Sequence, residues 1–139
     1  MVARLTLAMA LLALAMAGPT SASAQSAEGG IVIELNKTEQ HEGACWLYML
    51  FDNRSDRRFD RLEVDLVLFD GDGVVIRRQP VLAPLAPAHM SLKVYNLDGL
   101  QCAAVDRILI NDVTCGGDGD GSCLGMVEAR SRGPVSLVK

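Results

Sequence analysis

The chain has 139 residues, with 13 basic and 17 acidic side chains and a formal net charge of −4. An acidic chain without a stripe of lysine and arginine is a poor candidate for binding nucleic acid. Its length fits one domain, because domains of about 100 to 150 residues are the commonest. We therefore expect a single domain that does not act on DNA or RNA.

The first residues have the pattern of a secretory signal peptide. Arg4 precedes an apolar run over residues 5–17, and Ala22-Ser23-Ala24 forms an A-x-A cleavage site. As a helix the apolar run would reach only about 20 Å, short of the ~30 Å hydrocarbon core, so stable membrane insertion is not expected. We predict a cleaved signal over residues 1–24 and a domain over residues 25–139 that is periplasmic or secreted.

Alternation of apolar and polar residues predicts short strands through the rest of the chain. Gly, Pro, Asn and Asp separate them at roughly ten-residue intervals. The tail over residues 131–139 has little to pack against and is expected to be disordered. The pattern predicts an all-β fold, an immunoglobulin-like antiparallel β-sandwich of about seven strands. The expected strands are 31–35, 45–51, 61–70, 74–82, 89–97, 107–113 and 124–129.

Two strands carry apolar residues whose orientation decides whether a surface patch forms. The alternation in HMSLKVYNL suggests that Met90 turns inward with Leu92. In CWLYMLF, the side chains of Trp46, Tyr48 and Leu50 lie on the face opposite to that of Cys45. The strand is then either central and covered on both faces, or it exposes these three residues as a patch for a partner.

Four cysteines in an exported chain indicate two disulfides. Pairing Cys102 with Cys115 is disfavoured, because the extended segment between them would separate its ends by about 40 Å, whereas a disulfide needs about 6 Å. Of the two remaining arrangements we favour Cys45 with Cys102 and Cys115 with Cys123, since the turn-prone residues of TCGGDGDGSC bring the last pair together easily.

The same segment has the composition of a cation-binding loop but not its spacing. Starting from Asp118, the sixth position is Cys123 instead of glycine, and the twelfth is Ala129 instead of glutamate. We therefore predict a disulfide-closed turn and no metal site, with Asp118 and Asp120 as weak candidate ligands.

Six segments of the chain resemble a known family: IELNKTE, GACWLYMLFDNRSD, LEVDLVLFDGDGVVIRR, LAPLAP, SLKVYNLDGLQC and ILINDVTC. They are similar to an uncharacterised group of exported alphaproteobacterial proteins labelled "Tat pathway signal sequence domain protein". The resemblance implies a bacterial envelope protein, although no twin arginine precedes the apolar run. The order of strands and turns also looks like FxLYD-type immunoglobulin-like domains, which implies the fold only.

Motifs of catalysis are missing from the sequence. It contains no G-x-S-x-G, H-E-x-x-H or glycine-rich phosphate loop. We predict no enzymatic activity and no cofactor. The expected function is that of a binding or accessory domain that acts in the bacterial periplasm by protein–protein interaction with an envelope protein. A carrier of a small ligand or metal ion is the alternative.

Overall fold

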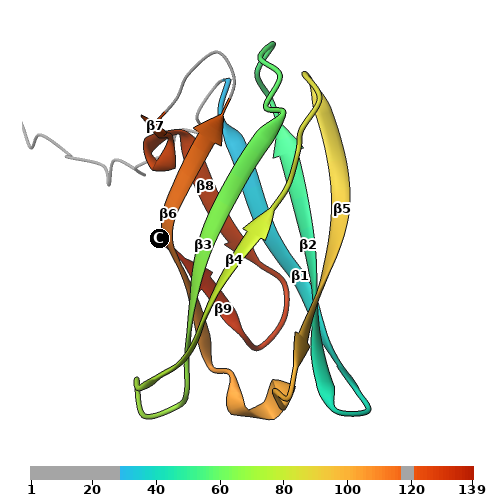
Figure 1. The fold of residues 1–139 in the computed structure, drawn as a ribbon, viewed down its shortest axis with the longest axis vertical. Helices are drawn as coiled ribbons and strands as arrows, with labels where there is room; N and C mark the ends of the chain where they lie inside the picture. Colours follow the sequence, from blue (N-terminus) through green and yellow to red (C-terminus); the bar gives the residue numbers. More distant parts are fainter. Residues whose placement is uncertain (1–28, 117–120) are drawn as a thin grey trace, which may run out of the picture.

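The computed structural model describes residues 29–116 and 121–139, which fold as a sandwich of two β-sheets (Figure 1). One sheet has the strand order β5-β2-β1-β8, and the other has the order β4-β3-β6-β7 with β9 also pairing with β6. The predicted all-β sandwich is therefore confirmed. The strands are β1 Ile31–His41, β2 Ala44–Asn53, β3 Arg61–Phe69, β4 Val75–Leu82, β5 His89–Asp98, β6 Arg107–Gly116, β7 Gly121–Ser122, β8 Val127–Ser131 and β9 Ser136–Val138.

Strand pairing departs from the prediction at the C-terminal end of the chain. The sheets are mixed and not wholly antiparallel, because β8 pairs parallel with β1 and β9 pairs parallel with β6. The expected strand 124–129 begins instead as the 3₁₀ helix Leu124–Met126. The prediction of a disordered tail over residues 131–139 is wrong. Val135 and Leu137 are buried in the core, and this burial attaches the tail to both sheets.

Alternation of side chains places the core between the sheets. On β3, Leu62, Val64, Leu66 and Leu68 have no exposed surface, as the period of two predicts. β2 buries every second residue from Cys45 to Phe51 in the same way. The residues between them therefore face away from the core, on the outer surface of each sheet.

Both predicted disulfides form. Cys45 bonds with Cys102 across 4.9 Å between their Cα atoms, and Cys115 bonds with Cys123 across 5.9 Å. The first joins β2 to the 3₁₀ helix Cys102–Ala104, and the second joins β6 to the residue that precedes the 3₁₀ helix Leu124–Met126. Two disulfides fit a chain that matures in an oxidising compartment. In the described part of the chain, no helix is long and apolar enough to cross a membrane.

Candidate functional site

The outer surface of the four-stranded sheet carries six apolar or aromatic side chains on two neighbouring strands. The register of β2 and β5 sets Tyr48 opposite Val94 and Leu50 opposite Leu92. The next pairs extend this surface with Trp46 and Met90. Met90, Leu92 and Val94 are 55%, 53% and 44% exposed, whereas the three residues of β2 are half-buried. We call these six residues the β2–β5 face: Trp46, Tyr48, Leu50, Met90, Leu92 and Val94.

The outward orientation of Met90 and Leu92 corrects the sequence-based prediction. Leu97 is fully buried and fixes the parity of β5, so the even-numbered residues face outward. Tyr95 also faces inward, where its ring packs edge-on against Phe51 at 6.4 Å between ring centroids. Its hydroxyl donates a 2.8 Å hydrogen bond to the carbonyl of Leu82, and burial raises the pKa of Tyr95. Apolar residues occur on both faces of β5, and the sequence pattern therefore did not distinguish inside from outside.

A β-bulge in β1 brings polar side chains onto the aromatic rings of the face. Between Leu35 and Lys37 the register shifts by one residue, so Lys37 lies opposite Tyr48. The Lys37 ammonium sits 4.2 Å from the centre of the Tyr48 ring. His41 stacks on Trp46 with 3.8 Å between the ring centroids and 21° between the ring planes. Each aromatic ring is thus packed against a side chain of β1 before any partner arrives.

Glu39 links the two residues that cover these rings. Its carboxylate pairs with the Lys37 ammonium, and its Oε1 lies 2.8 Å from His41 Nε2. The hydrogen bond with Lys37 lowers the pKa of Glu39, and the same bond raises the pKa of Lys37. Lys37, Glu39 and His41 share one outward-facing row of β1. Their mutual contacts order the side chains that cover the two aromatic rings and leave them open to solvent.

An open groove of about 310 Å³ adjoins the other end of the face. Leu50 and Met90 form its apolar side, and Arg54, Arg130 and Arg132 form its polar side. Each arginine is paired with a carboxylate on the same surface, so the groove combines apolar contact with charge-paired donors. The pairs are Arg54–Asp52 at 2.8 Å, Arg130–Glu128 at 2.7 Å and Arg132–Glu34 at 3.1 Å.

Asn53, the last residue of β2, positions the chain that leads into β5. Its fully buried side chain donates 2.8 Å hydrogen bonds to the carbonyls of Arg57 and Ala86. Its Oδ1 accepts from the backbone N–H and the hydroxyl of Ser55, at 3.1 and 2.7 Å. The Ser55 hydroxyl in turn accepts a hydrogen bond from the backbone N–H of Arg57. A single side-chain amide thus joins the loop that precedes β3 to the loop that precedes β5.

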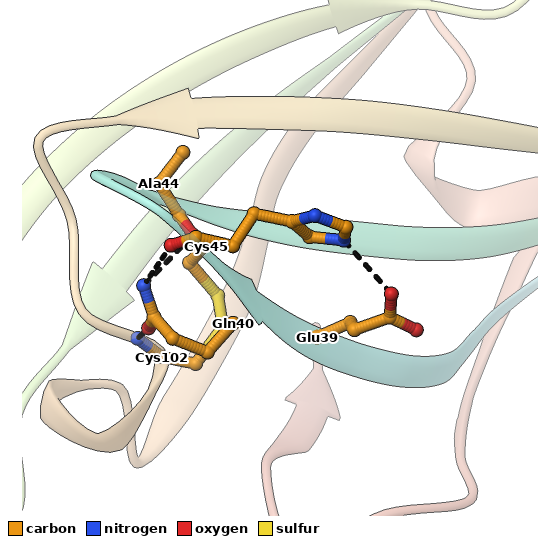
Figure 2. The surroundings of a disulfide bond; sticks show 6 residues. Glu39, Gln40, Ala44, Cys45 and Cys102 are labelled. Atoms are coloured by element: carbon orange, nitrogen blue, oxygen red, sulfur yellow. Dashed lines mark hydrogen bonds and ion pairs between the residues drawn. A yellow bond between two sulfur atoms is a disulfide. The ribbon is translucent and has the colours of Figure 1, made fainter.

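The opposite end of β2 is fixed by the first disulfide and by Gln40. The Gln40 side-chain amide donates to the carbonyls of His41 and Ala44 at 2.7 and 2.9 Å and accepts from the Cys102 N–H at 2.7 Å (Figure 2). These bonds lie beside the Cys45–Cys102 bridge and tie the β1–β2 turn to the 3₁₀ helix. The strand that carries Trp46 and Tyr48 is consequently held at both ends.

Possible metal ligands are sparse in the same structure. Residues 29–116 and 121–139 contain no group of three or more His, Cys, Asp or Glu side chains arranged to hold an ion. The weak candidates Asp118 and Asp120 lie outside the described residues. Both histidines belong to strands of the four-stranded sheet, His41 at the end of β1 and His89 at the start of β5.

Fold and site together define a disulfide-bonded β-sandwich with a partly exposed apolar sheet face. No family model matches the chain, and no curated protein does. Among solved structures, the chain is similar to IrmA from Escherichia coli, with a TM-score of 0.61 and 17% sequence identity. The match covers 72% of this chain and 90% of that chain. At this identity the likeness supports the fold alone.

Proposed function

We propose that this chain is an exported, non-enzymatic binding domain that recognises another protein of the bacterial envelope through the β2–β5 face. One observation carries the proposal: two adjacent strands present a contiguous apolar surface to solvent. Small monomeric proteins rarely expose contiguous apolar surface without a partner for it.

The composition of this surface supports a protein partner over a small ligand. Protein interfaces commonly have an apolar and aromatic centre, enrichment in arginine and a polar rim. Here Tyr48 lies opposite the aliphatic Val94 and Trp46 lies opposite the polar Asn96. Paired arginines line the adjoining groove. The face is an open sheet surface, whereas small-molecule sites are concave and enclose most of the ligand.

Pre-ordering of the face also favours recognition. Lys37 and His41 hold the two aromatic rings, and both ends of β2 are fixed by buried hydrogen bonds or a disulfide. A surface that is already ordered loses less conformational entropy when a partner binds. The N-terminal pattern and the two disulfides support an envelope location, where the partner would be encountered.

The test is native mass spectrometry of the tagged protein isolated from the periplasm of its own cells under non-reducing conditions. We expect a stoichiometric complex for the wild type and its loss in Leu50→Arg, which places a charge in the middle of the face. Val67→Arg is the matched control, because Val67 is half-buried on the outer surface of the other sheet. Retention of the complex by Leu50→Arg, or a wild-type chain isolated without any partner, would contradict the proposal.

A further inference from the structure

An open hollow of about 290 Å³ lies where two loops meet the first half of β5. Its walls come from residues 58–60, from residues 84–86 and from the odd-numbered row of β5. Its volume is at the lower end of the range for small-ligand sites, about 300 to 1,000 Å³. We call it the Arg58–Lys93 hollow. Its titratable lining residues are Arg58, Asp60, His89 and Lys93, and Pro84 and Ala86 belong to its apolar lining.

Hydrogen bonds fix the backbone of both loops around this hollow. Phe59 and Leu85 form an antiparallel bridge and exchange two backbone hydrogen bonds, at 2.9 and 2.8 Å. The buried side chain of Asn53 donates to the carbonyl of Arg57 in the first loop and to a carbonyl in the second. Arg58 therefore lies between two anchored residues. Its backbone is ordered before any ligand binds, which lowers the entropic cost of binding.

Arg58 and Lys93 are the two basic residues whose side chains have no polar or aromatic partner within the described part of the chain. Every other lysine and arginine of residues 29–116 and 121–139 pairs with a carboxylate, donates to a carbonyl or a sulfur, or lies over an aromatic ring. The chain has 17 acidic and 13 basic side chains, so a shortage of carboxylates does not explain the difference. Both unpaired cations line one hollow, where they concentrate positive potential.

Lys93 has the greater need for a counter-ion. It is half-buried and lies on the same side of β5 as the fully buried Leu97. Among the described residues it forms no ion pair. A charge that is partly withdrawn from water without a counter-ion costs free energy, and an anion in the hollow would offset that cost. An inward-pointing lysine also protects an edge strand, a role that needs no ligand and that the experiment below separates.

Asp60 sets the charge of the ligand that fits the hollow. Its carboxylate lines the same hollow, so Arg58, Lys93 and Asp60 together leave an excess of one positive charge when His89 is neutral. A monoanion balances that excess. A dianion such as sulfate would exceed it and would be repelled by Asp60. Among monoanions, a carboxylate matches the planar fork of a guanidinium, which can donate two parallel hydrogen bonds to it.

We propose that the Arg58–Lys93 hollow is a binding site for a small monocarboxylate with a short aliphatic chain. The Arg58 guanidinium donates to both carboxylate oxygens, and the Lys93 ammonium neutralises the charge from the side of β5. Pro84 and Ala86 provide the apolar wall for the aliphatic chain. The site lies on the inward-facing side of β5, whereas the β2–β5 face lies on the outward-facing side. It is therefore separate from the surface proposed to bind a protein.

Nuclear magnetic resonance titration of the isotope-labelled, full-length mature protein tests this site, with sodium butyrate as the probe at constant ionic strength. Saturable shifts of backbone amides are expected at residues 58–60, 84–86 and 93. Butyramide has the same carbon chain without the charge and should produce no saturable shift at the same concentrations. Sodium sulfate should bind more weakly than butyrate, because Asp60 opposes the second negative charge.

Two variants remove one cation each and retain part of its aliphatic stem, Arg58→Gln and Lys93→Met. Each should weaken butyrate binding by about tenfold or more, since each removes a charge-assisted hydrogen bond. The matched control is Arg61→Gln, because Arg61 is exposed in the same segment, pairs with Glu63 and does not line the hollow. It should bind butyrate as the wild type does. Leu50→Arg should also bind butyrate normally, so this proposal and the proposed function can fail separately.

The proposal is overturned if butyrate causes no saturable shift, if butyramide shifts the same amides equally, or if sulfate binds more tightly. Unchanged affinity in Lys93→Met would also contradict it and would leave Lys93 with only the protection of the edge strand. An N-acetylated tri-alanine peptide with a free carboxylate supplies the last comparison. If this peptide binds more tightly than butyrate, the assignment to a free small molecule is wrong.

Discussion

Replacing Asn53 by alanine should destabilise the domain far more than its place at the end of β2 suggests. The substitution removes four hydrogen bonds from a side chain with no exposed surface, two donated and two accepted. At about 1 kcal/mol for each bond, the expected loss in the free energy of unfolding is about 4 kcal/mol. Domains of this size are stable by only about 5 to 15 kcal/mol, so the loss would be a large part of the total.

Urea denaturation of purified Asn53→Ala and wild-type protein measures this loss. The matched control is Asn36→Ala, because Asn36 is exposed and donates one 3.1 Å bond to Glu34. Its effect should be within about 0.5 kcal/mol. Amide exchange in Asn53→Ala should also quicken at the start of β5, since the Ser55 loop holds Ala88. A loss below about 1 kcal/mol with an unchanged urea dependence would refute the assignment of Asn53 as the joint between the loops.

The remaining predictions concern pH and the disulfides. Burial raises the pKa of Tyr95, so its contribution to stability is complete below the ordinary tyrosine pKa and is lost as the pH rises above about 10; Tyr95→Phe should flatten the alkaline limb of stability against pH. The hydrogen bond from Arg78 lowers the pKa of Asp65, so stability is lost as the pH falls through that lowered value; Asp65→Asn should flatten the acid limb in the same denaturation series. Replacing the Cys45–Cys102 pair by alanines should destabilise by about 4 kcal/mol, and replacing Cys115–Cys123 by about 2.6 kcal/mol, because the loops span 57 and 8 residues. An equal loss from the two pairs would contradict the loop-length argument.

Most of the fold follows from patterns that are local in the sequence. The period of two on β3 identifies its buried row, and the four cysteines pair as their spacing favoured. Those signals suffice because each strand's burial depends on its own alternation. The C-terminal residues were different, because Val135 and Leu137 become buried only through pairing with distant strands. A short segment with three aliphatic residues, Val135, Leu137 and Val138, gives no local sign of such pairing.

The candidate site was predicted in part. The alternation in β2 placed Trp46, Tyr48 and Leu50 on one face, and the structure exposes that face partly. The contribution of β5 was missed, since either of its faces could have formed the core until the burial of Leu97 set the parity. The bulge after Leu35 was also missed, although it turns Lys37 onto Tyr48. A bulge depends on the partner strand and leaves no residue signature here.

The most direct measurement of the central claim is iodide quenching of Trp46 fluorescence, alone and in the complex isolated with the protein. Trp46 is the single tryptophan of the chain and lies on the β2–β5 face, and its stacked partner His41 covers only one side of the ring. The free protein should be quenched by iodide. In the complex, once any emission from the partner's own tryptophans is subtracted, Trp46 should be protected from iodide and its emission shifted to the blue. Equal quenching of Trp46 in the free and bound protein would show that the partner binds elsewhere and would contradict the account.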